Sequence, residues 1–134
     1  MAERRIFHRC PNCGQRNLYQ QRMMPPHPLR GPTANFHCRG CFTNSPGQGE
    51  TETERLAWAQ AFVVANNRRH ELIEIGFGRI LPGQTFELGN GFTPKETAEF
   101  EAVTTETERL MEPMYAEMEE TNTRLKAMLE ARNA

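Results

Sequence analysis

The sequence predicts a small α+β protein in which short antiparallel strands come first and helices make up most of the remainder. Three observations support this prediction: four cysteines form two closely spaced pairs before residue 42, the charge changes sign near residue 50, and apolar residues recur at helical spacing over 94–134. We therefore divide the chain into a ribbon of short strands (1–49), a helix with a β-hairpin (50–93) and a long acidic helical arm (94–134).

The composition leaves little apolar material for a core. Of 134 residues, 37% are hydrophobic and 25% are charged, and the mean hydropathy is -0.71, which is more polar than an ordinary globular domain. Small folds with weak cores commonly depend on a structural metal or a partner chain. The sequence has no apolar stretch that suits a membrane span or a secretion signal, so we expect an intracellular protein, in cytoplasm or nucleus, without membrane contact.

The charge is divided sharply along the chain. Residues 1–49 contain seven arginines and one acidic residue, Glu3, whereas residues 50–134 carry nine basic and sixteen acidic side chains. The first part therefore has a net charge of +6 and the second of -7. Such a division predicts two different kinds of partner, or an attraction between the two parts.

The cysteine spacing predicts a metal site. Cys10 and Cys13 form one Cys-x2-Cys pair, followed by Gly14, and Cys38 and Cys41 form a second. Each pair places two thiolates on one tight turn, and two such pairs suit tetrahedral Zn²⁺. Inside a reducing cell they favour a metal over disulfides, although four thiolates also hold iron.

Two other interpretations of these residues are weaker. A thioredoxin-like dithiol needs one pair beside a βαβ unit, and this chain has two pairs and no such unit. His8 and His37 adjoin the cysteines and could replace one as a ligand, but a histidine beside a metal site more often packs or donates a hydrogen bond.

The segments Cys10-Pro-Asn-Cys13-Gly and Phe36-His-Cys38-Arg-Gly-Cys41-Phe resemble the zinc-ribbon superfamily over about residues 4–44. Members of this superfamily occur in transcription factors, RNA polymerase subunits, ribosomal proteins and nucleic-acid enzymes, so the resemblance implies a metal-bound fold without a single function. Its transcript-cleavage factors carry an acidic pair at the ribbon tip. Because no Asp or Glu lies between Glu3 and Glu50, we do not expect that activity.

The ribbon also carries residues suited to nucleic acid. Arginine guanidinium groups bind phosphates in a planar fork, and aromatic rings stack on unpaired bases. The alternative is that the arginines only keep a small ribbon soluble. The candidate contacts are Arg4, Arg5, Arg9, Arg16, Tyr19, Arg22, Arg30, Phe36, Arg39 and Phe42.

Short strands are expected around Ile6-Phe7, Leu18-Tyr19 and Asn35-Phe36. The Pro-rich loop 23–29 separates the second from the third, and residues 44–49, rich in Gly, Pro and Ser, predict a linker. Met23, Met24 and Leu29 lie on a loop too short to bury them. We expect them to contact a protein partner or to fold back onto the ribbon.

A helix is expected to begin after Thr51, which has capping-box spacing to Glu54, and to end near Asn66-Asn67. Apolar residues from Leu72 to Ile80, then Pro82-Gly83 and the segment 85–88, predict a β-hairpin.

The second helix is expected to start at Pro94, with Thr93 as its cap and Glu96 closing a capping box. An apolar stripe then continues almost to the end of the chain, and Pro113 predicts a kink or a break. The stripe residues expected to bind a protein partner are Leu110, Met114, Met118, Leu125 and Met128.

Catalytic motifs are incomplete. The segment 70–74 has Glu where a zinc-protease helix needs a second His, and 76–78 lacks the third Gly of a dinucleotide motif. The sequence therefore predicts no enzyme and no small-molecule substrate. It predicts a non-catalytic accessory factor that contacts nucleic acid or a nucleic-acid-processing machine and binds a protein partner or larger assembly through its arm. The alternative is a structural or assembly subunit in which the ribbon is only a fold staple.

Overall fold

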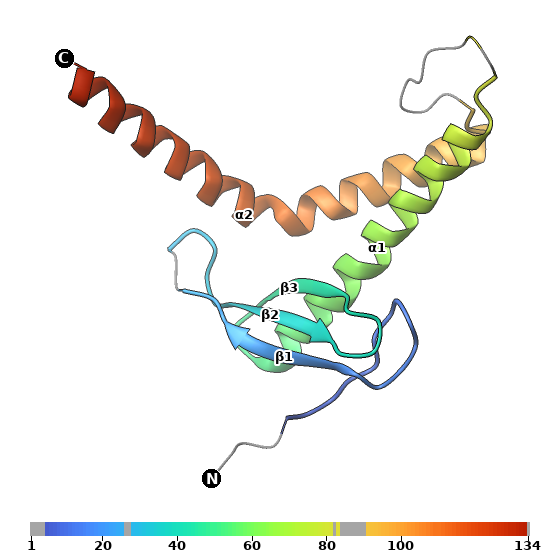
Figure 1. Cartoon of the computed structure of the whole chain (residues 1–134), viewed down its shortest axis with the longest axis horizontal. Coiled ribbons are helices and arrows are strands. Elements are labelled where there is room, and N and C mark those ends of the chain that lie inside the picture. Colours follow the sequence, from blue (N-terminus) through green and yellow to red (C-terminus); the bar gives the residue numbers. More distant parts are fainter. Residues whose placement is uncertain (1–4, 26–27, 82, 84–90, 134) are drawn as a thin grey trace.

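The computed structural model describes residues 5–25, 28–81, 83 and 91–133 (Figure 1). Three strands, β1 (Leu18–Met23), β2 (Thr33–Cys38) and β3 (Asn44–Gln48), precede two helices, α1 (Glu52–Gly78) and α2 (Pro94–Asn133). The predicted α+β class, with antiparallel strands followed by a long C-terminal helix, is confirmed.

The strands form one antiparallel sheet in the order β1-β2-β3. Because side chains alternate along a strand, the sheet has two distinct faces. Leu18, Phe36 and Cys38 are fully buried on the face that packs against Ala59 of α1, and Figure 1 shows the start of α1 behind the sheet. We call the opposite face, which includes His37, the open face.

Two of the three strand predictions hold, at Leu18-Tyr19 and at Asn35-Phe36. The expected strand at Ile6-Phe7 is wrong, because in the described part of the chain, which begins at residue 5, pairing there consists of one bridge between His8 and Leu18.

The expected linker at 44–49 is also wrong, since Asn44–Gln48 forms β3. Pro46 has no N–H to donate, and an edge strand tolerates this because one side of it needs no ladder partner. Gly47 allows the helix to approach closely: a Cβ there would lie 2.6 Å from the Phe36 ring and would collide with the Arg55 carbonyl. The residues that suggested a break therefore suit an edge strand pressed against a helix.

Helix α1 begins as predicted, with the Thr51 hydroxyl accepting the Glu54 N–H at 3.1 Å. It runs past Asn66-Asn67 to Gly78, so the first arm of the expected hairpin is wrong, and the segment 85–88 lies outside the described residues. Polar side chains just beyond the expected end make contacts to α2 instead: Arg68 pairs with Glu99 at 2.5 Å, and Arg69 donates to Thr104 at 3.2 Å. Leu72, which was expected in the hairpin, lies in α1 and is fully buried.

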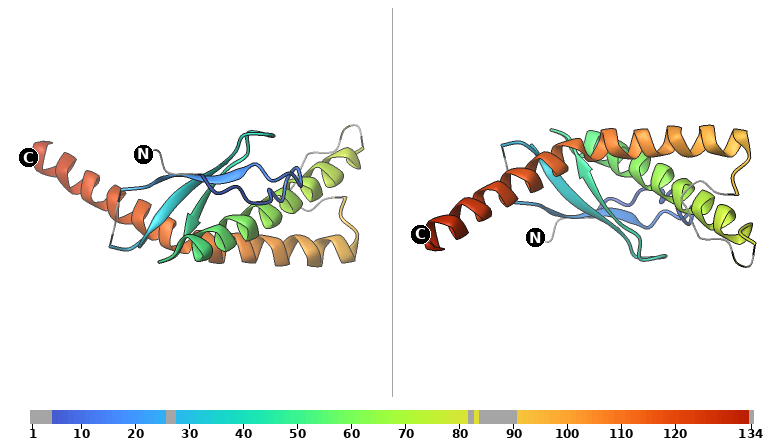
Figure 2. Two further views of the ribbon diagram at one scale, coloured as in Figure 1. Left: turned by 90° about the horizontal axis from the view of Figure 1, so that it is seen from below. Right: turned by 90° about the horizontal axis from the view of Figure 1, so that it is seen from above.

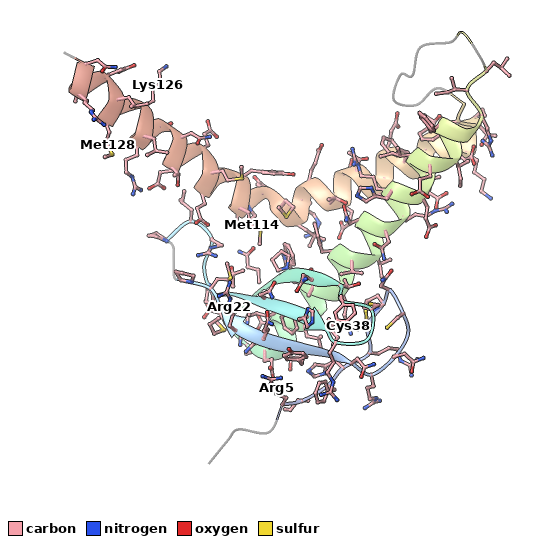
Figure 3. The ribbon with its side chains drawn as sticks, in the orientation of Figure 1. Arg5, Arg22, Cys38, Met114, Lys126 and Met128 are labelled. Atoms are coloured by element: carbon pink, nitrogen blue, oxygen red, sulfur yellow. The ribbon has the colours of Figure 1, made fainter. Side chains whose placement is uncertain are left out.

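Helix α2 begins with the expected capping box. Thr93 N–H donates to the Glu96 carboxylate at 2.9 Å, and Glu96 N–H donates to the Thr93 hydroxyl at 3.2 Å. The helix continues through Pro113 and bends there rather than breaking, as Figure 3 shows beside the labelled Met114. Figure 2 shows the first half lying along α1 and the second half running away from α1, and residues 119–133 are all exposed.

Within the described part of the chain, neither helix combines the length and apolarity needed to cross a membrane.

Candidate metal centre

The first cysteine pair lies on a compact turn, residues 10–15, which we call the first cysteine turn. The Cys10 N–H donates to the Gln15 carbonyl at 2.9 Å, and the Gly14 N–H donates to the Cys10 carbonyl at 2.8 Å. Gly14 has a φ of 76°, a left-handed conformation that glycine adopts without steric cost. The turn therefore folds both sulfurs toward one side.

The second cysteine pair lies on a turn with the same hydrogen bonds, residues 38–43, the second cysteine turn. The Cys38 N–H donates to the Thr43 carbonyl at 2.9 Å, and the Phe42 N–H donates to the Cys38 carbonyl at 2.8 Å. Phe42 has a φ of 63°. Two segments of different sequence thus present their cysteines in the same way.

The four sulfurs converge between these turns. The Sγ atoms of Cys10 and Cys41 are 3.7 Å apart, as are those of Cys13 and Cys38, and all four lie within 4.8 Å of one another. A disulfide would hold two sulfurs at about 2.05 Å, so these are free thiols. Four ligands at about 2.3 Å from a tetrahedral zinc ion are separated by about 3.8 Å. The four cysteines are thus positioned to bind a metal ion.

The surroundings of the sulfurs differ. The amide of Asn12 lies 3.4 Å from the Cys41 sulfur and the Thr43 hydroxyl lies 3.0 Å from it. Burial raises the pKa of Cys41, but the hydrogen bonds from Thr43 and Asn12 outweigh it and lower the pKa to about 6. Burial raises the pKa of Cys10 to about 11. A cation among the sulfurs would favour the thiolate form at every one of them.

Helix α1 holds the first cysteine turn in place. The Asn67 amide donates to the Asn12 side chain at 2.9 Å, and the Gln60 amide donates to the Arg9 carbonyl at 3.2 Å. Polar residues midway along α1, near the end that the sequence predicted for this helix, thus hold the first cysteine turn. Asn12, Gln60 and Asn67 were not among the predicted site residues, and single amide side chains gave no signal in the sequence.

Neither histidine beside the cysteines belongs to the sulfur cluster identified among the described residues. His37 lies on the open face, where its Nδ1 is 2.9 Å from the Asn44 side-chain oxygen.

The open face carries a continuous series of rings, which we call the aromatic run: Phe7, Tyr19, His37 and Phe42. Successive ring centroids are 5.6, 5.9 and 6.2 Å apart. The guanidinium carbon of Arg5 lies 4.8 Å from the Tyr19 ring centroid, and that of Arg39 lies 4.2 Å from the Phe7 ring centroid. Several residues predicted to contact nucleic acid are therefore brought together, joined by Phe7 and His37, which were not among them.

Other predicted nucleic-acid contacts are placed elsewhere. Phe36 is fully buried in the core and offers no face to a base, and Tyr19 is only 6% exposed. Arg30 is buried and pairs with Glu117 at 2.9 Å, so its guanidinium is not on the basic surface. The predictions for Phe36, Tyr19 and Arg30 as surface contacts are therefore wrong. Arg9, Arg16 and Arg22 are exposed, and Arg4 lies outside the described residues.

The residues predicted to bind a protein partner also lie in different environments. Met24 folds back toward α2, lining with Met114 and Met118 a pocket of about 240 Å³. Leu110 is buried. Of the other predicted partner contacts, Met118, Leu125 and Met128 are more than half exposed, and Met23 and Leu29 are slightly less than half exposed.

Four cysteine ligands complete the coordination of a tetrahedral ion, and such closed sites stabilise folds, whereas catalytic zinc keeps one position open for water or substrate. The geometry of this cluster therefore suits a structural metal. No known protein family, curated protein or solved structure matches this chain.

Proposed function

We propose that this protein is a non-catalytic, intracellular accessory factor. In this proposal Zn²⁺ bound by the four cysteines stabilises the ribbon, the open face contacts nucleic acid or a nucleic-acid-processing machine, and the exposed half of α2 binds a protein partner.

Zinc is the proposed metal because of the donor set. Four thiolates at tetrahedral spacing favour zinc, with iron as the competing occupant. The sulfur separation of 3.7 Å within two pairs agrees with a single ion rather than a cluster of several. Elemental analysis of the purified protein tests the assignment, and a protein that contains neither zinc nor iron would refute it.

The nucleic-acid proposal is carried by the charge of the ribbon. Residues 5–49 contain no Asp or Glu, and five of their arginines are exposed: Arg5, Arg9, Arg16, Arg22 and Arg39. Figure 3 places Arg5 on the side of the sheet away from α2, so the acidic helix does not cover it. A positive surface of this kind attracts phosphates and releases the counterions around them.

The protein-partner proposal is supported by the second half of α2. Met118, Leu125, Met128 and Leu129 are each more than half exposed on one helix that leaves the rest of the molecule. This same feature favours the alternative function, an assembly subunit in which the metal serves folding alone.

Salt-dependent binding separates the two functions. The full-length, metal-loaded protein would be titrated with short oligonucleotides at several salt concentrations. A variant with Arg16, Arg22 and Arg39 changed to Gln is compared with a control in which Arg124, Lys126 and Arg132 are changed to Gln, because both lose three positive charges.

We expect the ribbon variant to bind more weakly to all sequences, with a slope of log affinity against log salt that is flatter by about two or three units. The arm variant should retain the original slope, and both should retain their metal. If the unaltered protein binds no oligonucleotide at low salt, the nucleic-acid proposal fails and the assembly function replaces it.

A further inference from the structure

We propose that Phe42 is a base-stacking residue, so that the open face binds single-stranded rather than duplex nucleic acid. This inference rests on the proposed function, since it specifies the ligand of the same surface.

Phe42 stands at a backbone position that glycine would occupy without strain. Among the described residues, Phe42 is the one non-glycine residue with a positive φ, a conformation that costs an L-residue about 1–2 kcal/mol. Its side chain is 72% exposed, so burial returns little of that cost. The first cysteine turn meets the same backbone requirement with Gly14, so an exposed phenylalanine at this place in the second turn points to a role in binding a ligand.

The position of Phe42 at one end of the aromatic run adds an independent observation. Its ring centroid lies 6.2 Å from that of His37, and His37 is held in turn by Asn44 and by the Tyr19 ring. The inner ring of Tyr19 is covered by Phe7 and by the Arg5 guanidinium. Phe42 is therefore the member of the run whose ring is most accessible to a base.

Cations flank this ring system. Arg39 follows the first cysteine of the same turn as Phe42, and its guanidinium is fixed over Phe7 at 4.2 Å. A guanidinium stacked on a ring keeps its N–H groups directed outward in the plane, where they can bind phosphate. The Asn44 side chain fixes both neighbours of this surface, because its oxygen lies 2.9 Å from His37 Nδ1 and its amide donates to the Phe42 carbonyl at 3.3 Å. An exposed ring for stacking and a cation for phosphate binding thus meet on one surface.

The form of the surface favours unpaired bases. A base in a duplex is stacked on both sides, so a single projecting ring cannot reach its face without opening the helix. An unstacked base offers that face directly. Stacking is also insensitive to base identity, so we infer a preference for single strands with little sequence specificity.

The test uses the full-length, metal-loaded protein and four matched probes: an oligothymidylate, an oligouridylate, an abasic strand with the same number of phosphates, and a duplex. Phe42→Gly removes the ring and suits the positive φ, whereas Phe42→Trp retains an aromatic face. Tyr115→Ala, which removes a half-exposed ring from α2, is the control. Metal content and helical circular dichroism confirm that each variant folds.

Phe42→Gly should weaken binding to both single strands about tenfold and leave binding to the abasic strand and the duplex unchanged. Phe42→Trp should bind as tightly as the unaltered protein, and its added fluorescence should be quenched by the single strands. A loss confined to DNA or to RNA would support the inference and assign that ligand.

The inference is overturned if Phe42→Gly binds single strands as the unaltered protein does, or loses equal affinity for the abasic strand. Salt-dependent binding would persist in both cases, so the proposed function would stand. Absence of binding to every probe would refute both.

Discussion

Phe42 occupies in the second cysteine turn the position that Gly14 occupies in the first. The two residues have φ values of 63° and 76°, and each donates its N–H to the carbonyl of the leading cysteine of its turn at 2.8 Å. The turn geometry thus demands a left-handed residue at both places, and the sequence supplies glycine at only one.

Phe42→Gly should therefore stabilise the protein. Removing the left-handed strain should raise the free energy of unfolding by about 1 kcal/mol, since the exposed ring gives up few contacts. Thermal unfolding of the metal-saturated protein measures the change. A lower unfolding temperature would show that the ring contributes more to folding than its exposure indicates.

Metal removal should unfold the ribbon selectively. Because the binding energy of a structural metal is also folding energy, Cys13→Ser or chelation should abolish the dispersed amide signals of residues 5–49. The helical signal of α2 should largely persist, since much of that helix lies away from the sheet. Nuclear magnetic resonance and circular dichroism report the two parts separately. Cys10 and Cys13 found joined in a stable disulfide would contradict the metal site.

Arg55 should contribute far more to stability than Arg109, which is exposed and holds the same position in a second copy of the hexapeptide Thr-Glu-Thr-Glu-Arg-Leu. Arg55 is 8% exposed and donates to the Gln20 side chain at 2.8 Å and to the carbonyls of Gly49 and Glu50 at 3.0 and 3.1 Å. Arg55→Met removes the buried guanidinium from these three acceptors, two of them on partly buried residues, and should cost about 2–3 kcal/mol.

Arg109→Met is the matched control. The Arg109 side chain is 64% exposed and pairs with Glu106 one turn earlier on the same helix, so its loss should change the unfolding free energy by less than about 0.5 kcal/mol. Urea unfolding compares the two variants, and equal effects would refute the role assigned to Arg55.

Leu110 and Leu125 should differ in their contribution to stability, although both belong to the predicted apolar stripe. Leu110 is 5% exposed and Leu125 is 51% exposed. Leu110→Ser should lower the unfolding free energy by about 3 kcal/mol and increase protease sensitivity. Leu125→Ser should leave both unchanged and weaken only the binding of a partner. Unchanged protease resistance in Leu110→Ser would show that this part of α2 is not a packing face.

The start of α2 should weaken in acid. A hydrogen bond from Arg79, supported by the Thr93 N–H, lowers the pKa of Glu96 from 4.5 to about 2. Because the folded pKa lies below the unfolded one, the contribution is fully present above about pH 4.5 and is lost as the pH falls toward 2. Glu96→Gln should therefore reduce the dependence of stability on pH in this window. Glu101→Gln, on the same helix, is the control, and identical profiles for the two variants would contradict the prediction.

Features that depend on short-range interactions could be predicted from the sequence. The cysteine spacing predicted the four-sulfur cluster, because tight turns fix which side chains meet. The capping residues Thr51 and Thr93 predicted both helix starts, since the bonds they form span only three residues. Pro113 predicted the bend in α2 for the same reason: the hydrogen bond that it lacks is local.

Tertiary contacts decided the rest. The hexapeptide Thr-Glu-Thr-Glu-Arg-Leu occurs at 51–56 and at 105–110, yet its arginine is buried at Arg55 and exposed at Arg109, and its leucine is more deeply buried at Leu110. Identical local sequence cannot distinguish these environments, because burial depends on which distant element packs against the helix. In the same way, Pro46 and Gly47 suggested a linker, but they belong to an edge strand. The elements that hold them, β2 and α1, lie elsewhere in the chain, so the local sequence could not reveal the strand.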